Sequence, residues 1–74
     1  MPGLPVCTPT DVERALLRAG FFLHHSRGSH RYYRHPSTGR IAVVPFHARD
    51  LKRGTLHGIL KQAGLTRDEF VNHL

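Results

Sequence analysis

The spacing of the apolar residues changes at Gly20, and this change constrains the fold of the chain more than any other feature. Before Gly20 the apolar residues follow the i, i+3, i+4, i+7 pattern of an amphipathic helix: Val12, Ala15, Leu16 and Ala19. After Gly20, three short segments with the composition of strands occupy residues 21–26, 30–35 and 40–45. Turns that contain glycine separate these segments, which predicts an antiparallel meander.

Capping residues mark where the first helix begins. It starts either at Thr10, with Glu13 completing a capping box, or at Thr8, with Pro9 in the first turn. Both positions offer a side-chain oxygen to the free N–H groups of the first turn, so the sequence leaves the choice between them open.

A second helix is expected after a polar, basic loop at residues 46–54. Thr55 is placed to cap this helix and Gly64 to end it. Its apolar stripe is Leu56, Ile59, Leu60 and Ala63. Thr66 and Glu69 then repeat the capping-box spacing at the start of a short terminal helix.

The element order predicts an α+β domain with the pattern α-β-β-β-α and a short extra C-terminal helix. Its three-stranded antiparallel sheet is expected to carry the helices on one face and to leave the other face free for a ligand. Residues 1–7 hold two prolines and a glycine, so we expect a flexible N-terminal tail before a single domain at residues 8–74. A domain of this size has little space for a buried cofactor, and none is expected.

Cysteine usage and hydropathy suggest a cellular compartment. Cys7 is the one cysteine of the chain, so an internal disulfide is impossible and a reducing cytoplasm is the expected location. No apolar run approaches the ~20 residues that a membrane span needs, and the first residues lack the pattern of a signal peptide. We therefore expect a soluble, cytoplasmic protein that does not contact a membrane.

Positive charge is concentrated in the middle of the chain. The sequence has 11 Lys and Arg against 5 Asp and Glu, for a net charge of +6. No acidic residue lies between Arg14 and Arg49, and the five other arginines of that interval stand unopposed in sequence. A phosphate backbone is the natural counterpart of such a field, although an acidic protein partner satisfies the same electrostatics.

His30 follows the turn Gly28-Ser29 and opens the most basic and aromatic stretch of the chain. Strand alternation predicts two faces, with His30, Tyr32 and Arg34 on one and Arg31, Tyr33 and His35 on the other. An imidazole titrates near neutral pH, so His30 can remove a proton from the 2′-hydroxyl of RNA. The alternative is a hydrogen-bonded strand histidine with no catalytic role.

Other residues are candidates to support this chemistry. His47, after the third strand, is a second acid–base group, since two histidines can act as base and acid in turn, and Ser29 is a further supporting residue. One of the two adjacent tyrosines is expected to enter the core, which leaves the other to stack on a base. The candidate RNA-binding residues are Arg27, Gly28, Arg31, Tyr32, Arg34, Lys52 and Arg53.

The histidines do not predict a metal site. Their spacing matches no zinc motif, and no carboxylate lies near them in sequence. His24 and His25 are adjacent, so in a regular strand their side chains are expected to point to opposite faces.

In their order along the chain, these residues resemble the HicA (YcfA-like) toxins, small mRNA interferases of bacterial toxin–antitoxin systems. The matching positions are Leu16–Phe21, Gly28-Ser29-His30, Tyr33–Pro36, Val43-Val44-Pro45 with His47, Gly54-Thr55-Leu56, residues 59–65 and Glu69-Phe70. The resemblance implies a fold like that of double-stranded-RNA-binding domains. It also implies metal-independent cleavage of mRNA, with the histidine of the Gly-Ser-His motif, His30, as the catalytic residue.

The resemblance further implies a HicB-type antitoxin that restrains the activity, and an arrest of translation and growth when the toxin is free. Whether the mRNA is bound to a ribosome stays open. Two alternatives fit the same fold: a module that binds double-stranded RNA without chemistry, and a basic protein that binds only a partner protein.

Overall fold

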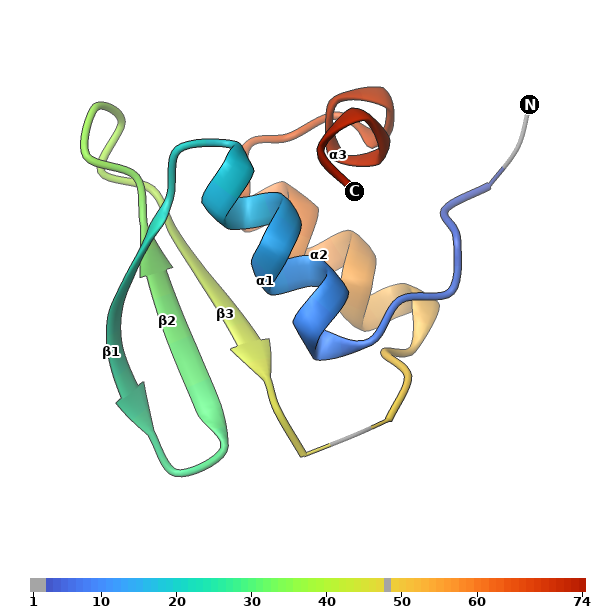
Figure 1. The fold of residues 1–74 in the computed structure, drawn as a ribbon, viewed down its shortest axis with the longest axis horizontal. Helices are drawn as coiled ribbons and strands as arrows, with labels where there is room; N and C mark the ends of the chain where they lie inside the picture. Colours follow the sequence, from blue (N-terminus) through green and yellow to red (C-terminus); the bar gives the residue numbers. More distant parts are fainter. Residues whose placement is uncertain (1–2, 48) are drawn as a thin grey trace.

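The computed structural model describes residues 3–47 and 49–74. Its elements are α1 (Pro9–Arg18), β1 (Phe22–Arg27), β2 (His30–Arg34), β3 (Ile41–Pro45), α2 (Arg53–Ala63) and α3 (Arg67–His73). The strands form one antiparallel sheet in the order β1-β2-β3 (Figure 1). Residues 1 and 2 of the predicted tail and Ala48 of the predicted loop lie outside the described residues.

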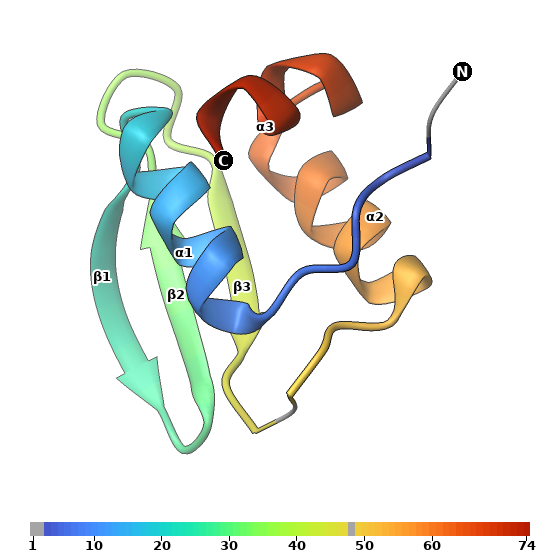
Figure 2. The ribbon, with the colours of Figure 1, turned by 45° about the vertical axis from the view of Figure 1, so that its right-hand side comes forward.

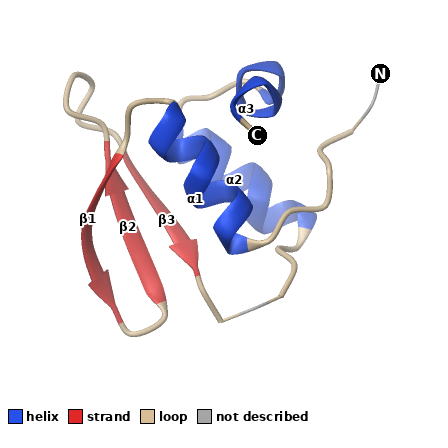
Figure 3. Ribbon diagram, viewed as in Figure 1, coloured by secondary structure: helices blue, strands red, loops and turns tan. Residues whose placement is uncertain are grey.

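The helices cover one face of the sheet. Helix α1 lies across the strands, α2 packs beside β3, and α3 packs on α1 (Figure 2). Helices and strands therefore form two layers, as the colouring by secondary structure makes plain (Figure 3). This arrangement confirms the predicted α+β fold, with a three-stranded antiparallel sheet and a short additional C-terminal helix. Within the described part of the chain, no helix is long and apolar enough to cross a membrane.

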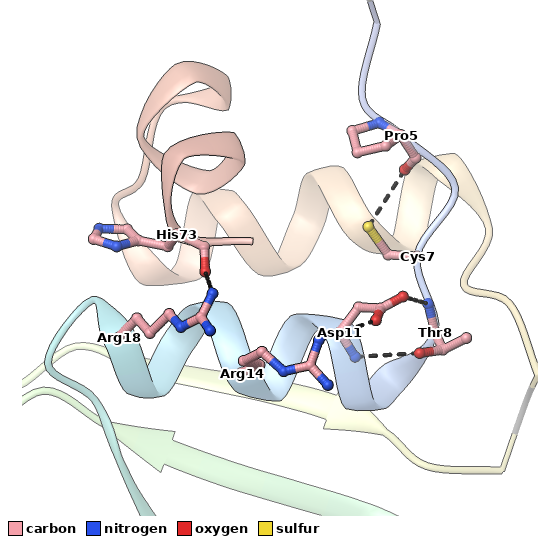
Figure 4. Close-up of polar contacts among 7 residues, drawn as sticks. All are labelled: Pro5, Cys7, Thr8, Asp11, Arg14, Arg18 and His73. Atoms are coloured by element: carbon pink, nitrogen blue, oxygen red, sulfur yellow. Dashed lines mark hydrogen bonds and ion pairs between the residues drawn. The ribbon is translucent and has the colours of Figure 1, made fainter.

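Helix α1 begins at the earlier of the two predicted starts. The Thr8 hydroxyl accepts a hydrogen bond from the Asp11 N–H at 3.2 Å, and the Thr8 N–H donates to the Asp11 carboxylate at 3.0 Å (Figure 4). Pro9, which needs no hydrogen-bond acceptor for its nitrogen, follows directly. The alternative box with Glu13 does not form, and the Glu13 carboxylate is free to bind elsewhere.

The other two helices test two further predictions. The capping box of Thr66 and Glu69 is present at α3, which confirms that prediction. The predicted cap of α2 by Thr55 is wrong, because α2 already begins at Arg53 and has no side-chain cap. Leu51, buried just before α2, donates its N–H to the Cys7 carbonyl at 2.8 Å, which fixes where the chain enters the helix.

One core joins the sheet to the helices and to the segment before α1. Its buried residues are Leu4, Cys7, Val12, Ala15, Leu16, Phe21, Tyr33, Ala42, Val44, Leu51, Leu56, Ile59, Leu60, Ala63 and Phe70. The loose tail expected at residues 1–7 therefore does not extend to Leu4 and Cys7, because both pack into this core. Burial, with a smaller contribution from Asp11, raises the pKa of the Cys7 thiol.

The two outer strands of the sheet end differently. At the β3 edge, the Val43 N–H donates to the side-chain oxygen of Gln62 in α2 at 3.0 Å. In β1 the register with β2 slips by one residue between Leu23 and His25, so His24 is an extra, bulged residue.

Candidate functional site

The face of the sheet that no helix covers is defined by the alternation along β2. Tyr33 is fully buried against the helices, whereas Tyr32 is half-buried and His30 and Arg34 are exposed. The prediction that one tyrosine enters the core and the other does not is thus confirmed. His30, Tyr32 and Arg34 share the uncovered side, which we call the open face.

His30 and His47 meet at one end of the open face. His30 is the first residue of β2 and pairs with Pro45, the last residue of β3. The Phe46 N–H then donates to the Ser29 carbonyl at 2.7 Å, which continues the contact between the two chain segments beyond the sheet. The imidazole centroids of His30 and His47 are 6.1 Å apart, with the ring planes 50° to each other.

This separation suits two groups that act on one substrate. Both rings are exposed, and among the described residues no hydrogen bond joins them. A phosphate oxygen placed between the rings lies within hydrogen-bond reach of both, which is the geometry that shared acid–base chemistry requires.

A stack of two aromatic rings lies beside this pair. The rings of His25 and Tyr32, on neighbouring strands, are nearly parallel at 9° with centroids 4.3 Å apart. His25 was not a candidate in the sequence. No signal in the sequence could have found it, because its pairing with Tyr32 depends on the register of β1.

The prediction that His24 and His25 point to opposite faces is wrong. Their Nδ1 atoms are 2.7 Å apart, because the bulge at His24 breaks the alternation of β1. The pair does not form a metal centre by itself. Throughout residues 3–47 and 49–74, no group of three or more His, Cys, Asp or Glu side chains is placed to hold a metal ion.

Arg31 lies on the helix-covered side and not on the open face. Its Nη1 donates to the Glu13 carboxylate of α1 at 2.9 Å, and its guanidinium carbon lies 4.0 Å from the centre of the Phe46 ring. The Tyr33 hydroxyl donates to the same carboxylate. The hydrogen bond to Glu13 raises the pKa of Arg31, so its charge is held in this contact.

The remaining candidates are divided between two places. Arg27 is paired opposite His30 in β1, and Gly28 has a φ of 58° with open space around it. A cavity of about 230 Å³ is lined by Pro45, His47, Asp50, Leu51, Lys52 and Thr55. Lys52 and His47 thus share one hollow. Arg53 instead lies beside Gly3 and lines a second cavity with residues 4–6, away from the histidine pair.

Comparison with protein families gives one match. A family described as HicA toxin of bacterial toxin-antitoxin matches residues 9–65. The range runs from the first residue of α1 to just past α2, so it contains the whole sheet, His30 and His47. The match agrees with the resemblance carried by the Gly28-Ser29-His30 motif and the residues around it. Comparison with curated proteins finds no match.

Proposed function

The chain belongs to the HicA toxin family of bacterial toxin–antitoxin systems, and on this premise we propose that it is a metal-independent endoribonuclease that cleaves mRNA. His30 acts as the general base or acid, and His47 takes the complementary role. The observation that carries the proposal is the 6.1 Å separation of the two imidazoles on a face that no helix covers.

The cleavage step needs only groups that RNA and the two histidines supply. One neutral imidazole removes the proton from the 2′-hydroxyl, whose oxygen attacks the adjacent phosphorus. The bond from phosphorus to the 5′-oxygen breaks, and the second imidazole, protonated, gives that oxygen its proton. The products are a 2′,3′-cyclic phosphate and a 5′-hydroxyl, and no water, metal or cofactor enters this step.

The surroundings of the histidines supply attraction for RNA. Arg27 and Arg34 lie on exposed positions of the open face, and Lys52 lines the hollow that His47 enters. We assign phosphate binding to these three cations, which also neutralise charge that develops on the phosphorus during attack. The His25–Tyr32 stack offers an aromatic surface to an unpaired base.

The proposal includes a protein partner. Membership of the family implies an antitoxin, and we propose one of the HicB type that covers the open face and blocks access of mRNA. The net charge of +6 favours an acidic surface on that partner. Action on mRNA places the toxin in the bacterial cytoplasm.

The test compares His30→Ala and His47→Ala with His57→Ala, a matched control at an exposed histidine of α2. Cleavage of a labelled mRNA is measured in the presence of EDTA, with growth arrest on induction as a second measurement. We expect each active-site variant to lose about 10²-fold or more in rate and the control to lose nothing. The cleaved 3′ ends should carry a cyclic phosphate.

Two results would contradict the proposal. One is cleavage at the wild-type rate by a folded His30→Ala variant. The other is intact RNA recovered from a saturated complex with the wild-type protein, which would indicate an RNA-binding module without chemistry.

A further inference from the structure

We propose that Arg31 is a positioning residue: held between the Glu13 carboxylate and the Phe46 ring, it fixes the segment after β3 so that His47 faces His30. The inference rests on the proposed function, because it concerns how the second histidine of that site is placed. It removes Arg31 from the RNA-binding residues that the sequence predicted.

The first half of this contact is an anchor on α1. The Glu13 carboxylate accepts hydrogen bonds from Arg31, at 2.9 Å, and from the Tyr33 hydroxyl. Arg31 and Tyr33 are two residues apart on β2, so their side chains leave the strand on the same side. Two donors from a paired strand therefore hold one carboxylate, and the guanidinium acquires a fixed position above the sheet.

The second half joins this anchor to the segment that carries His47. The guanidinium lies over the Phe46 ring at 4.0 Å, within the range of a cation–π contact. The Phe46 backbone is held as well, since its N–H donates to the Ser29 carbonyl at 2.7 Å. Phe46 is thus fixed at both its backbone and its ring, and it is the residue directly before His47.

His47 depends on its neighbour for its place. Its imidazole is exposed and has no hydrogen-bond partner among the described residues. β3 ends at Pro45, which has no N–H to continue the ladder. The direction of the chain at His47 is therefore set by the two contacts of Phe46, one of which is Arg31.

The alternative role for Arg31 is a direct contact with a phosphate. Two observations disfavour it: the side chain lies on the covered side of the sheet, and its charge is already paired with Glu13. The two roles predict opposite measurements. A phosphate ligand contributes to affinity and to the dependence of affinity on salt, whereas a positioning residue contributes to the rate.

The experiment uses Arg31→Met, Glu13→Gln and Phe46→Leu, each alone and combined with His47→Ala, in the full chain. Cleavage of a labelled mRNA gives kcat and its pH profile. Binding and its salt dependence are measured with a 2′-O-methyl RNA, which lacks the nucleophile. Arg34→Met, on the open face, is the matched control for a phosphate ligand, and Phe46→Tyr is the conservative variant that keeps the ring. Thermal unfolding checks that each variant folds, which we expect because a partly exposed ion pair contributes little stability.

We expect each of the three single variants to lower kcat by about 10- to 100-fold, with affinity and salt dependence unchanged. In the His47→Ala background the same substitutions should cost nothing further, since they act through His47. The pH profile of Arg31→Met should lose the limb that His47→Ala loses. Phe46→Tyr should restore most of the rate, because the cation keeps an aromatic face.

The inference is overturned if the losses multiply in the His47→Ala background, or if Arg31→Met weakens RNA binding and its salt dependence as Arg34→Met does. If one variant fails to fold, the other two members of the contact decide. Failure of the proposed function is a separate result, since it appears as undiminished cleavage by His30→Ala.

Discussion

The Tyr33 hydroxyl of β2 donates a hydrogen bond to the Glu13 carboxylate of α1, and this contact ties the sheet to the helix above it. Burial, followed by the hydrogen bond to Glu13, raises the pKa of Tyr33 far above its ordinary value. In the unfolded chain the phenol ionises near pH 10. Because the folded state keeps its proton there and the unfolded state loses it, the free energy of unfolding falls as the pH rises above about 10.

Tyr33→Phe is therefore expected to change both stability and its pH dependence. At neutral pH the loss of the hydrogen bond should cost about 1 kcal/mol. Between pH values of about 9 and 11, the variant should lose less stability per pH unit than the wild type. Urea unfolding at several pH values measures this, with Tyr32→Phe as the control. Equal slopes for the wild type and Tyr33→Phe would contradict the assignment.

Two glycines should respond in opposite directions to alanine. Gly20 has a φ of 100°, and a Cβ there would lie 3.0 Å from the His35 Nε2, so Gly20→Ala should lower stability by about 1–3 kcal/mol. Gly58 lies inside α2 with nothing within 4 Å of its added Cβ. Close packing against the sheet is therefore not the reason for this glycine, and Gly58→Ala should raise stability by up to about 1 kcal/mol. Thermal unfolding of both variants checks the signs, and a stabilising Gly20→Ala would contradict the strain.

The cap of α1 should contribute to acid sensitivity. The backbone N–H and side chain of Thr8 hold the pKa of Asp11 below its ordinary value. Stability from this group is present above the unfolded pKa, near 4, and is lost as the pH falls below it. We expect Asp11→Asn to be less sensitive to a change from about pH 6 to pH 3 than the wild type. Asp50→Asn, in an exposed loop, is the control for urea unfolding, and identical behaviour of the two variants would count against the cap.

The same cap should respond to loss of its hydroxyl. Thr8→Ala leaves the Asp11 N–H without its acceptor and should cost about 1 kcal/mol at neutral pH. Thr10→Ala, at the start that the helix does not use, is the matched control and should have little effect. A larger loss for Thr10→Ala in urea unfolding would mean that the helix begins two residues later.

Stacking by Tyr32 can be separated from charge. Tyr32→Ala should weaken binding to a 2′-O-methyl RNA by about 5- to 100-fold, since a stacked base is worth roughly 1–3 kcal/mol. The dependence of affinity on salt should not change, because no cation is removed. Tyr32→Phe keeps the ring and should bind as the wild type. Unchanged affinity for Tyr32→Ala would leave the His25–Tyr32 stack without a role in RNA binding.

Much of the fold was predictable because it rests on local signals. The apolar spacing before and after Gly20, the capping box at Thr66 and the glycine that ends α2 each act within a few residues of sequence. The cap of α2 was not predictable in this way. Leu51 is held by Cys7, more than forty positions earlier, and a contact of that range leaves no mark on nearby residues.

The site divides along the same line. Alternation along β2 correctly separates His30 and Tyr32 from Tyr33, because a strand has a period of two. The bulge at His24 defeats alternation in β1, since its position depends on how two strands align. The partner of Arg31 was also hidden, because Glu13 lies on another element and its spacing suggested a cap instead.

The core that joins Leu4 to Phe70 has a consequence for the timing of synthesis. A ribosome delivers the chain from its first residue onward, and Phe70 of α3 leaves it after α1 and all three strands. Until Phe70 reaches its place beside α1, the layer of helices over the sheet is incomplete. A nascent chain thus remains unfinished while it is attached to the ribosome that reads its own message, and that message is translated before the histidine pair is set in a completed domain.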